Sequence, residues 1–208
     1  MKVGSQLFTA QGPRSVEKLA GLGFEIFLDL KFHDIPNTVA GAVASAAQLP
    51  GIRLLTLHTL GGSAMMRAAR EAAPARKKRP ALLGVTILTS MDAAALTEIG
   101  IADPPAARAL ALARLAKESG LDGVVASAHE VRAIRAACGP KFLIVVPGVR
   151  PANSSANDQA RVATPAEAIQ SGADYLVVGR PITSASNPRE AALSIAKEMA
   201  SAALSRRS

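Results

Sequence analysis

FLDLKFHDIPNTV, residues 27–39, is the stretch that decides the fold. It starts as an apolar, β-rich run and then places Asp29, Lys31 and Asp34 ahead of a helical segment. Because strand side chains alternate between two faces, Asp29 and Lys31 are expected on one face and Leu30 on the other. Two opposite charges at the end of an apolar strand are costly to bury unless they pair. This stretch is therefore a candidate for chemistry.

The rest of the chain alternates short β-rich runs with Ala-rich helical runs. Strands are predicted at 24–31, 52–58, 81–90, 123–127, 141–148 and 174–179, and helices at 36–48, 62–73, 104–119, 128–137, 164–171 and 188–203. MKVG at the start of the chain is read as the end of a seventh strand. Such alternation implies right-handed βαβ units and a parallel sheet covered on both faces.

The residues at the ends of these strands reduce the number of possible fold architectures. Their polar or turn-forming residues are Asp29, Lys31, His58, Thr59, Thr89, Ser90, Ser127, Pro147, Gly148, Gly179 and Arg180. An open doubly wound sheet would use only a few strands at its switch point, and the Gly-rich GxGxxG turn is missing from the sequence. We therefore predict an α/β fold, a (β/α)8 TIM barrel forming one domain over residues 1–208 and lacking its first strand in this chain. We expect the native gene to encode about 20 to 40 further residues before Met1.

Composition excludes several classes of function. The only cysteine, Cys138, excludes an internal disulfide framework. No apolar run approaches the ~18 residues needed to span a bilayer, and the start of the chain lacks the apolar core of a signal peptide. The net charge of +8 favours anionic partners, but aromatic residues make up only 3% of the chain, which argues against a base-stacking surface. We predict a cytoplasmic protein that binds neither nucleic acid nor membrane.

Two segments are candidates for binding phosphate. LVVGRPIT, residues 176–183, resembles the phosphate site that barrels build after their last strands, with Gly179 allowing close approach and Arg180 gripping the anion. An ordinary strand-to-loop turn is the alternative. The long connection 146–165 is a candidate lid from which Gln159 could reach the anion. Its alternative is a plain surface excursion.

The histidines and Asp34 also have simple structural explanations. His33, His58 and His129 are scattered over separate units, so we predict no metal site. His58 is expected to be a hydrogen-bonded core residue, and the other two are expected at the surface. Asp34 could cap the helix that starts near Pro36, and Asp29 with Lys31 could be a structural ion pair.

The motifs together resemble one known family. DLKFHDIPNTV at residues 29–39 is similar to the signature of orotidine 5'-phosphate decarboxylase. Further blocks of the same family, in the same order, are similar to MKVGSQLFTAQGP, VTILTSM, GVVASAHE, VPGVRP, DQARVATP and VVGRPIT. The resemblance covers nearly the whole chain. The front is the exception, because the family has a first strand ending in a ribose-binding Asp and this chain starts after it.

The resemblance implies a role for each matching residue. Lys2, Asp29, Lys31 and Asp34 correspond to the family's charged tetrad, with Asp34 reaching the site of a partner subunit. Thr38 corresponds to a contact from the neighbouring subunit to the ribose, and Ser127 to a contact with the pyrimidine. The remaining substrate-binding positions are Thr89, Pro147, Arg150, Gln159, Gly179 and Arg180, of which Gln159, Gly179 and Arg180 grip the phosphate.

The implied activity is decarboxylation of orotidine 5'-phosphate to UMP by a homodimer without cofactor or metal, with Lys31 stabilising and protonating a carbanion at C6. Two alternatives stay open. One is a metal-dependent sugar-phosphate lyase or epimerase on the same barrel, such as hexulose-phosphate synthase or pentose-phosphate epimerase. The other is a truncated, inactive phosphate-binding remnant.

Overall fold

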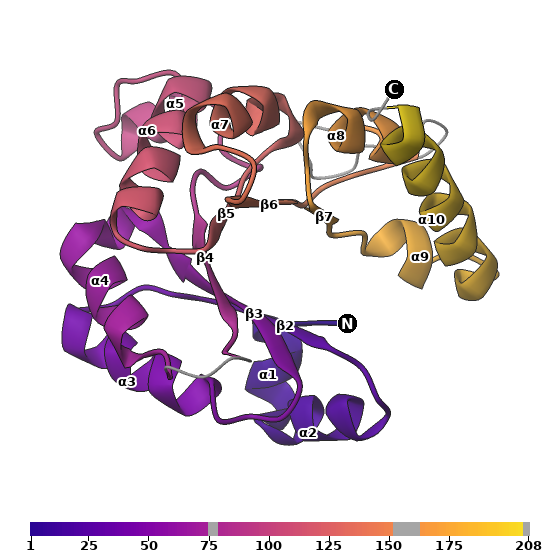
Figure 1. Cartoon of the computed structure of the whole chain (residues 1–208), viewed down its shortest axis with the longest axis horizontal. Coiled ribbons are helices and arrows are strands. Elements are labelled where there is room, and N and C mark those ends of the chain that lie inside the picture. Colours follow the sequence, from indigo (N-terminus) through magenta and orange to yellow (C-terminus); the bar gives the residue numbers. More distant parts are fainter. Residues whose placement is uncertain (75–78, 152–162, 206–208) are drawn as a thin grey trace. The chain divides into compact units, whose positions relative to one another are not determined.

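The computed structural model describes residues 1–74, 79–151 and 163–205 (Figure 1). Within them lie seven strands, as predicted. They are β1 (Lys2–Gly4), β2 (Ile26–Phe32), β3 (Ile52–His58), β4 (Ala81–Val85), β5 (Gly123–Val125), β6 (Leu143–Val146) and β7 (Tyr175–Leu176). The helices are α1 (Ser5–Gln11), α2 (Arg14–Gly21), α3 (Pro36–Ala46), α4 (Gly62–Ala72), α5 (Ala93–Glu98), α6 (Pro105–Glu118), α7 (Val131–Cys138), α8 (Pro165–Ser171), α9 (Arg180–Thr183) and α10 (Pro188–Ser205), with short 3-10 turns η1 (Thr59–Gly61) and η2 (Ala128–Glu130).

The chain divides into two compact units. Unit 1 comprises Met1–Thr86 and Leu112–Val124, and unit 2 comprises Ile87–Ala111 and Val125–Ser208. The boundary therefore runs through α6 and through β5. The predicted single domain over 1–208 stays a prediction.

Unit 1 is built on a parallel sheet. β1 pairs with β2, β2 with β3 and β3 with β4, all in parallel. Leu55, Leu57 and Leu82 are fully buried, which is typical of parallel strands covered by helices. Helices α3 and α4 lie side by side in this unit (Figure 1). Their positions follow from the apolar faces they bury, with Val43 and Met66 fully buried.

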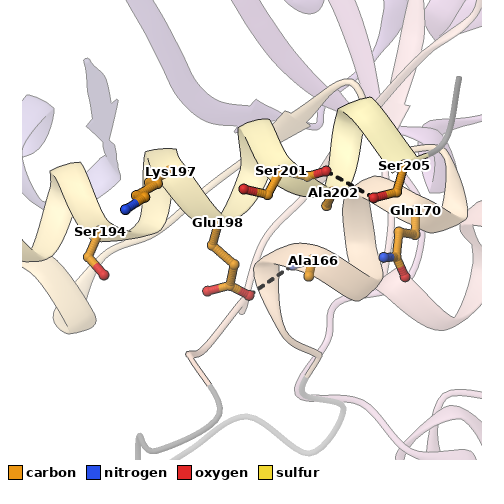
Figure 2. A pocket seen from close by; sticks show the side chains of 8 residues that line it. All are labelled: Ala166, Gln170, Ser194, Lys197, Glu198, Ser201, Ala202 and Ser205. Atoms are coloured by element: carbon orange, nitrogen blue, oxygen red, sulfur yellow. Dashed lines mark hydrogen bonds between the residues drawn. The ribbon is translucent and has the colours of Figure 1, made fainter.

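Unit 2 contains the parallel pair β6 and β7 and the helices α7, α8 and α10. Ile134 of α7 and Ile144 of β6 are fully buried. Helix α8 begins with a capping box in which Thr164 and Glu167 satisfy each other's backbone N–H groups. It packs against α10, whose Glu198 accepts a hydrogen bond of 3.1 Å from the backbone N–H of Ala166 (Figure 2).

The same aspartate arrangement occurs at the start of a strand in each unit. Asp122 lies just before β5, accepts a hydrogen bond of 2.8 Å from the N–H of Leu82, and binds Arg79 through two contacts of 2.6 Å. Asp174 lies just before β7, accepts from the N–H of Ile144 at 2.8 Å, and binds Arg135 at 2.6 Å. We call these the two aspartate clamps. Each ties the beginning of one strand to the loop that leads into another.

The predicted elements need several corrections. The run at 81–90 is a strand only to Val85, because the chain turns where the N–H of Met91 bonds to the carbonyl of Leu88 at 2.9 Å. The run at 174–179 forms a strand of only two residues. Four helices were not predicted, α1, α2, α5 and α9, each of eight residues or fewer. No helix in the described part of the chain is long and apolar enough to cross a membrane.

Candidate functional site

A cluster of three charges lies where β1 and β2 run side by side. Asp29 Oδ2 lies 3.2 Å from Lys2 Nζ, and both carboxylate oxygens of Asp29 lie 3.0 Å from Lys31 Nζ. The side chain of Asp29 is 11% exposed, whereas those of Lys2 and Lys31 are 36% and 37% exposed. One largely buried carboxylate is therefore shared by two ammonium groups that remain open to solvent. The structure thus brings together Lys2, Asp29 and Lys31, three members of the predicted charged tetrad.

The electrostatic balance at Asp29 favours its ionised form. Burial alone raises the pKa of this carboxyl, but the ammonium groups of Lys31 and then Lys2 outweigh burial, so the net pKa lies below its usual value. The cluster is thus a fixed set of alternating charges, the kind of arrangement that can stabilise a carbanion without water.

The side chains of Asp29 and Lys31 meet, but the backbone of β2 is irregular at Lys31. Its φ is +52°, the only positive φ of a non-glycine residue in the described chain. Its backbone N–H donates to the side chain of Thr56 at 2.9 Å instead of to a strand carbonyl. The Asp29–Lys31 pair therefore forms through an irregularity of the strand. Sequence reasoning missed Thr56, although a polar residue inside the apolar run 52–58 was a usable signal.

Asp34 and Thr38 lie outside this cluster. Both side chains are exposed, in the connection to α3 and in its first turns. Asp34 Oδ1 accepts from the N–H of Ile35 at 2.6 Å, yet the N-cap residue of α3 is Ile35, which has no side-chain capping bond. The expectation that Asp34 caps this helix is wrong, because its carboxylate turns to the adjacent N–H and does not reach the first turn.

The three histidines lie in separate elements, with His33 after β2, His58 at the end of β3 and His129 in η2. His58 is half-buried and its Nδ1 accepts from the N–H of Leu60 at 3.4 Å. Burial, followed by the nearby charges of His33 and Lys31, lowers the pKa of His58 to about 4. The rings of His33 and His58 stack with centroids 5.4 Å apart, and His33 and His129 are exposed. Among the described residues, no three His, Cys, Asp or Glu side chains are grouped to hold a metal ion.

The predicted substrate-binding residues of unit 2 follow its strands. Ser127 is fully buried after β5, where it forms a capping box with Glu130, a buried residue that the sequence reasoning missed. Thr89 and Pro147 are half-buried, and the guanidinium of Arg150 is buried beside the carbonyl of Val149.

Gly179 and Arg180 are exposed at the start of α9. Nothing lies within 4 Å of the place where a Cβ on Gly179 would stand, so the backbone there is open to a ligand. Pairing of β6 with β7 continues to the N–H of Val177, which bonds to the carbonyl of Val146 at 2.8 Å. Pro147 and Gly179 therefore follow the same ends of two neighbouring strands. Gln159 lies outside the described residues.

Unit 2 also carries an open groove of about 490 Å³ between α8 and α10. Figure 2 shows that its lining includes Gln170, Lys197, Glu198 and Ser201. None of the predicted site residues that the structure describes lines it. Its polar side chains are those of an ordinary solvated groove between two helices, and we assign it no role.

Comparison with known proteins assigns this chain to a family. The family model described as "Orotidine 5'-phosphate decarboxylase / HUMPS family" matches residues 1–195. The chain is 55% identical over 202 residues to the orotidine 5'-phosphate decarboxylase of Halorhodospira halophila, covering 97% of this chain and 85% of that protein. It is 56% identical over 197 residues to the protein of the same name from Anaeromyxobacter dehalogenans, covering 94% and 85%.

Solved structures agree with the sequence comparisons. The crystal structure of orotidine 5'-phosphate decarboxylase from Lactobacillus acidophilus matches with a TM-score of 0.83 at 43% identity, covering 95% of this chain and 85% of that one. The enzyme of that name from Pyrococcus horikoshii matches with a TM-score of 0.75 at 27% identity, covering 96% and 86%. The chain is thus a parallel α/β protein of TIM-barrel type, as predicted. It belongs to the orotidine 5'-phosphate decarboxylase / HUMPS family.

Proposed function

We propose that this protein decarboxylates orotidine 5'-phosphate to UMP in pyrimidine synthesis. The observation that carries the proposal is the cluster in which Lys2 and Lys31 share the buried carboxylate of Asp29, in a chain whose relatives bear the name of that enzyme. The enzyme is a carboxy-lyase. We expect it to act in the cytoplasm, since its single cysteine suits a reducing compartment.

The chemistry requires positive charge at one carbon atom. Loss of CO2 from C6 of the pyrimidine leaves an electron pair in the ring plane, where the ring delocalises it poorly. The Lys31 ammonium stabilises this pair and then donates a proton to C6, which leaves UMP and a neutral amine. Asp29 orients Lys31 and lies beside the departing carboxylate. Because Asp29 is mostly buried and doubly paired, its charge is already in place before the substrate arrives.

The substrate's remaining groups are assigned to the matching residues. Arg180, Gly179 and Gln159 bind the phosphate, and the exposure of Arg180 at the start of α9 supports this assignment. Ser127 contacts the pyrimidine, and Thr89, Pro147 and Arg150 complete the substrate contacts. Phosphate binding far from C6 contributes to the rate. Residues 152–162 of the candidate lid lie outside the described part of the chain.

The enzyme is proposed to work as a homodimer in which Asp34 and Thr38 of each subunit enter the partner's site. Their exposure supports this part of the proposal, because each side chain is free of the cluster in its own subunit. Asp34 would complete the alternation of charges as the neighbour of Lys31, and Thr38 would contact the ribose. A two-fold interface places the same pair of residues in both sites.

The test is a decarboxylation assay followed by loss of absorbance of orotidine 5'-phosphate. The wild-type protein should convert it to UMP at the same rate with and without EDTA. Lys31→Ala should lower kcat by at least about 100-fold, because the charge at C6 is lost. Lys141→Ala, at an exposed position that is not among the predicted site residues, is the matched control and should leave kcat unchanged.

Two results would refute the proposal. One is the absence of turnover by the folded wild-type protein. The other is activity that EDTA removes and Mg²⁺ restores, which would point to a metal-dependent sugar-phosphate lyase or epimerase of the same fold.

A further inference from the structure

The pairing of β2 with β3 shifts register at two places. The first lies between Ile26 and Phe27, where Arg53 of β3 is skipped. The second lies between Leu28 and Phe32, so residues 29–31 of β2 together face Thr56 of β3. From Leu54 to His58 β3 pairs with β4 without interruption, Thr56 lying opposite Leu83. The second distortion therefore belongs to β2, which bulges against this regular stretch of β3.

The side chain of Thr56 occupies the gap that this bulge leaves. Its Oγ1 accepts a hydrogen bond of 2.9 Å from the N–H of Lys31 and donates one of 3.0 Å to Oδ1 of Asp29. Thr56 is fully buried, so water does not compete for these bonds. A hydroxyl is the smallest side-chain group that can accept and donate at once. The Thr56 hydroxyl thus replaces the backbone hydrogen bond that the Lys31 N–H would make in a regular sheet, and its oxygen also donates to the Asp29 carboxylate.

The backbone at Lys31 needs such support. A φ of +52° is unfavourable for a residue with a long side chain and persists only when the surroundings determine it. In an undistorted strand the N–H of Lys31 would bond to a carbonyl of β3, whereas here it bonds to the Thr56 hydroxyl. The Thr56 hydroxyl is the contact that joins the unusual backbone to the ion pair.

We propose that Thr56 is a positioning residue for the Asp29–Lys31 pair in the decarboxylation described above. This inference rests on the proposed function. Thr56 touches no reacting atom. It acts by holding the Lys31 backbone in its left-handed conformation and one oxygen of Asp29 in a fixed place, so that the ammonium is aimed before substrate binds.

Two substitutions separate this role from simple packing. Thr56→Val keeps the shape of the side chain but removes both hydrogen bonds, and Thr56→Ser keeps the hydroxyl but removes a buried methyl group. If Thr56 only filled the core, the Ser variant would be the worse of the two in every respect. If Thr56 is a positioning residue, the two variants differ in what they lose. Thr56→Ser lowers thermal stability, whereas Thr56→Val lowers the catalytic rate.

The expected result is a drop in kcat of about 10- to 100-fold for Thr56→Val, with KM changed less than about threefold, because the reacting end of the site is misaligned while the phosphate grip is intact. Thr56→Ser should stay within about threefold of wild-type kcat. A folded Ser variant that loses kcat as much as the Val variant would overturn the proposal. So would a Val variant with wild-type kcat.

A second measurement keeps this inference separate from the proposed function. Crystal structures of the two variants should show Lys31 with a positive φ in Thr56→Ser and with a changed φ, or a lost Lys31–Asp29 contact, in Thr56→Val. If Lys31 kept its φ and its 3.0 Å contact in the Val variant, the inference would fail whatever reaction the protein catalyses. Failure of the wild type to convert orotidine 5'-phosphate would instead count against the proposed function alone.

Discussion

Asp29 forms ion pairs with both lysines of the charged cluster. Its carboxylate binds Lys2, Lys31 and Thr56 at 3.0 to 3.2 Å. Gly4 lies opposite Asp29 in the neighbouring strand, and a Cβ on Gly4 would lie 2.7 Å from Lys2 Nζ. The absence of a side chain at Gly4 therefore leaves the space in which Lys2 reaches the carboxylate. The charged site therefore depends on two uncharged residues, Gly4, which leaves space, and Thr56, which donates a hydrogen bond.

His58 gives a prediction about pH at the same scale. Because burial lowers its pKa to about 4, the unfolded chain binds a proton below pH ~6.5 that the folded chain does not. Stability from this group is therefore complete above pH ~6.5 and is lost as the pH falls toward 4. We expect a loss on the order of 2 kcal/mol by pH 5, measured as urea unfolding midpoints at pH 7.5 and 5.

The control for this prediction compares substitutions of His58 and of an exposed histidine. His58→Gln should reduce the loss of stability between the two pH values, whereas His129→Gln, at an exposed position, should leave it unchanged. Parallel losses in wild type and His58→Gln would show that another group is responsible. Asp29, whose pKa is lowered, adds its own loss only below about pH 4.

At the scale of elements, the two aspartate clamps determine where strands begin. In each clamp one carboxylate bonds to a backbone N–H of a neighbouring strand and to an arginine. Bonding to Asp122 raises the pKa of Arg79, so this guanidinium keeps its charge. Arg135 also donates to the carbonyls of Gly139, Phe142 and Gly172. The clamps act on strand starts, whereas the charged cluster combines Lys2 at the start of β1 with Asp29 and Lys31 in the second half of β2.

We expect the clamps to contribute stability without affecting catalysis. Asp122→Ala and Asp174→Ala should each lower the free energy of unfolding by about 1 to 3 kcal/mol, since each leaves an arginine and a strand N–H without their charged partner. Glu71→Ala, at an exposed position of α4, is the control and should change stability by less than about 0.5 kcal/mol. Chemical denaturation measures the change, and kcat of the folded variants should equal that of wild type. A clamp variant as stable as the control would contradict this.

At the scale of the whole molecule, the chain spans about 85% of the length of the curated relatives it matches. The charged cluster lies in unit 1, whereas Ser127, Pro147 and Arg180 lie in unit 2. Asp34 and Thr38 are exposed in unit 1 and are proposed to serve a partner subunit. The assembly, and not the single chain, is therefore the proposed catalytic unit.

Subunit exchange tests the assignment of Asp34. Lys31→Ala and Asp34→Asn proteins should each be nearly inactive. In a mixed dimer one site collects both defects and the other collects neither, because the interface is symmetric. With free exchange of equal amounts, half of the dimers are mixed and hold one intact site of two, so about one quarter of wild-type activity should return. Exchange is followed by native mass spectrometry. If mixed dimers form and no activity returns, Asp34 serves its own subunit.

The sequence by itself determined the succession of strands and helices, the number of strands and the pairing of Asp29 with Lys31. These features depend on local patterns, because alternation and apolar runs report burial along one segment, and a buried charge requires an opposite charge nearby. The seven predicted strands are all found, although β4 and β7 are shorter than predicted. Short helices such as α1 and α5 escaped prediction because so few residues carry too little periodicity.

Only the tertiary structure decided how the charged pair is held. The positive φ of Lys31 and the two hydrogen bonds of the Thr56 hydroxyl arise because, between Leu28 and Phe32, β2 has more residues than the edge of β3 can pair. That mismatch is a property of two strands together, and each strand alone is an ordinary apolar run. The clamps of Asp122 and Asp174 are likewise invisible in one segment, since their partners lie 30 to 43 residues away along the chain. A contact between distant segments depends on their register, and register is decided only when the strands pair.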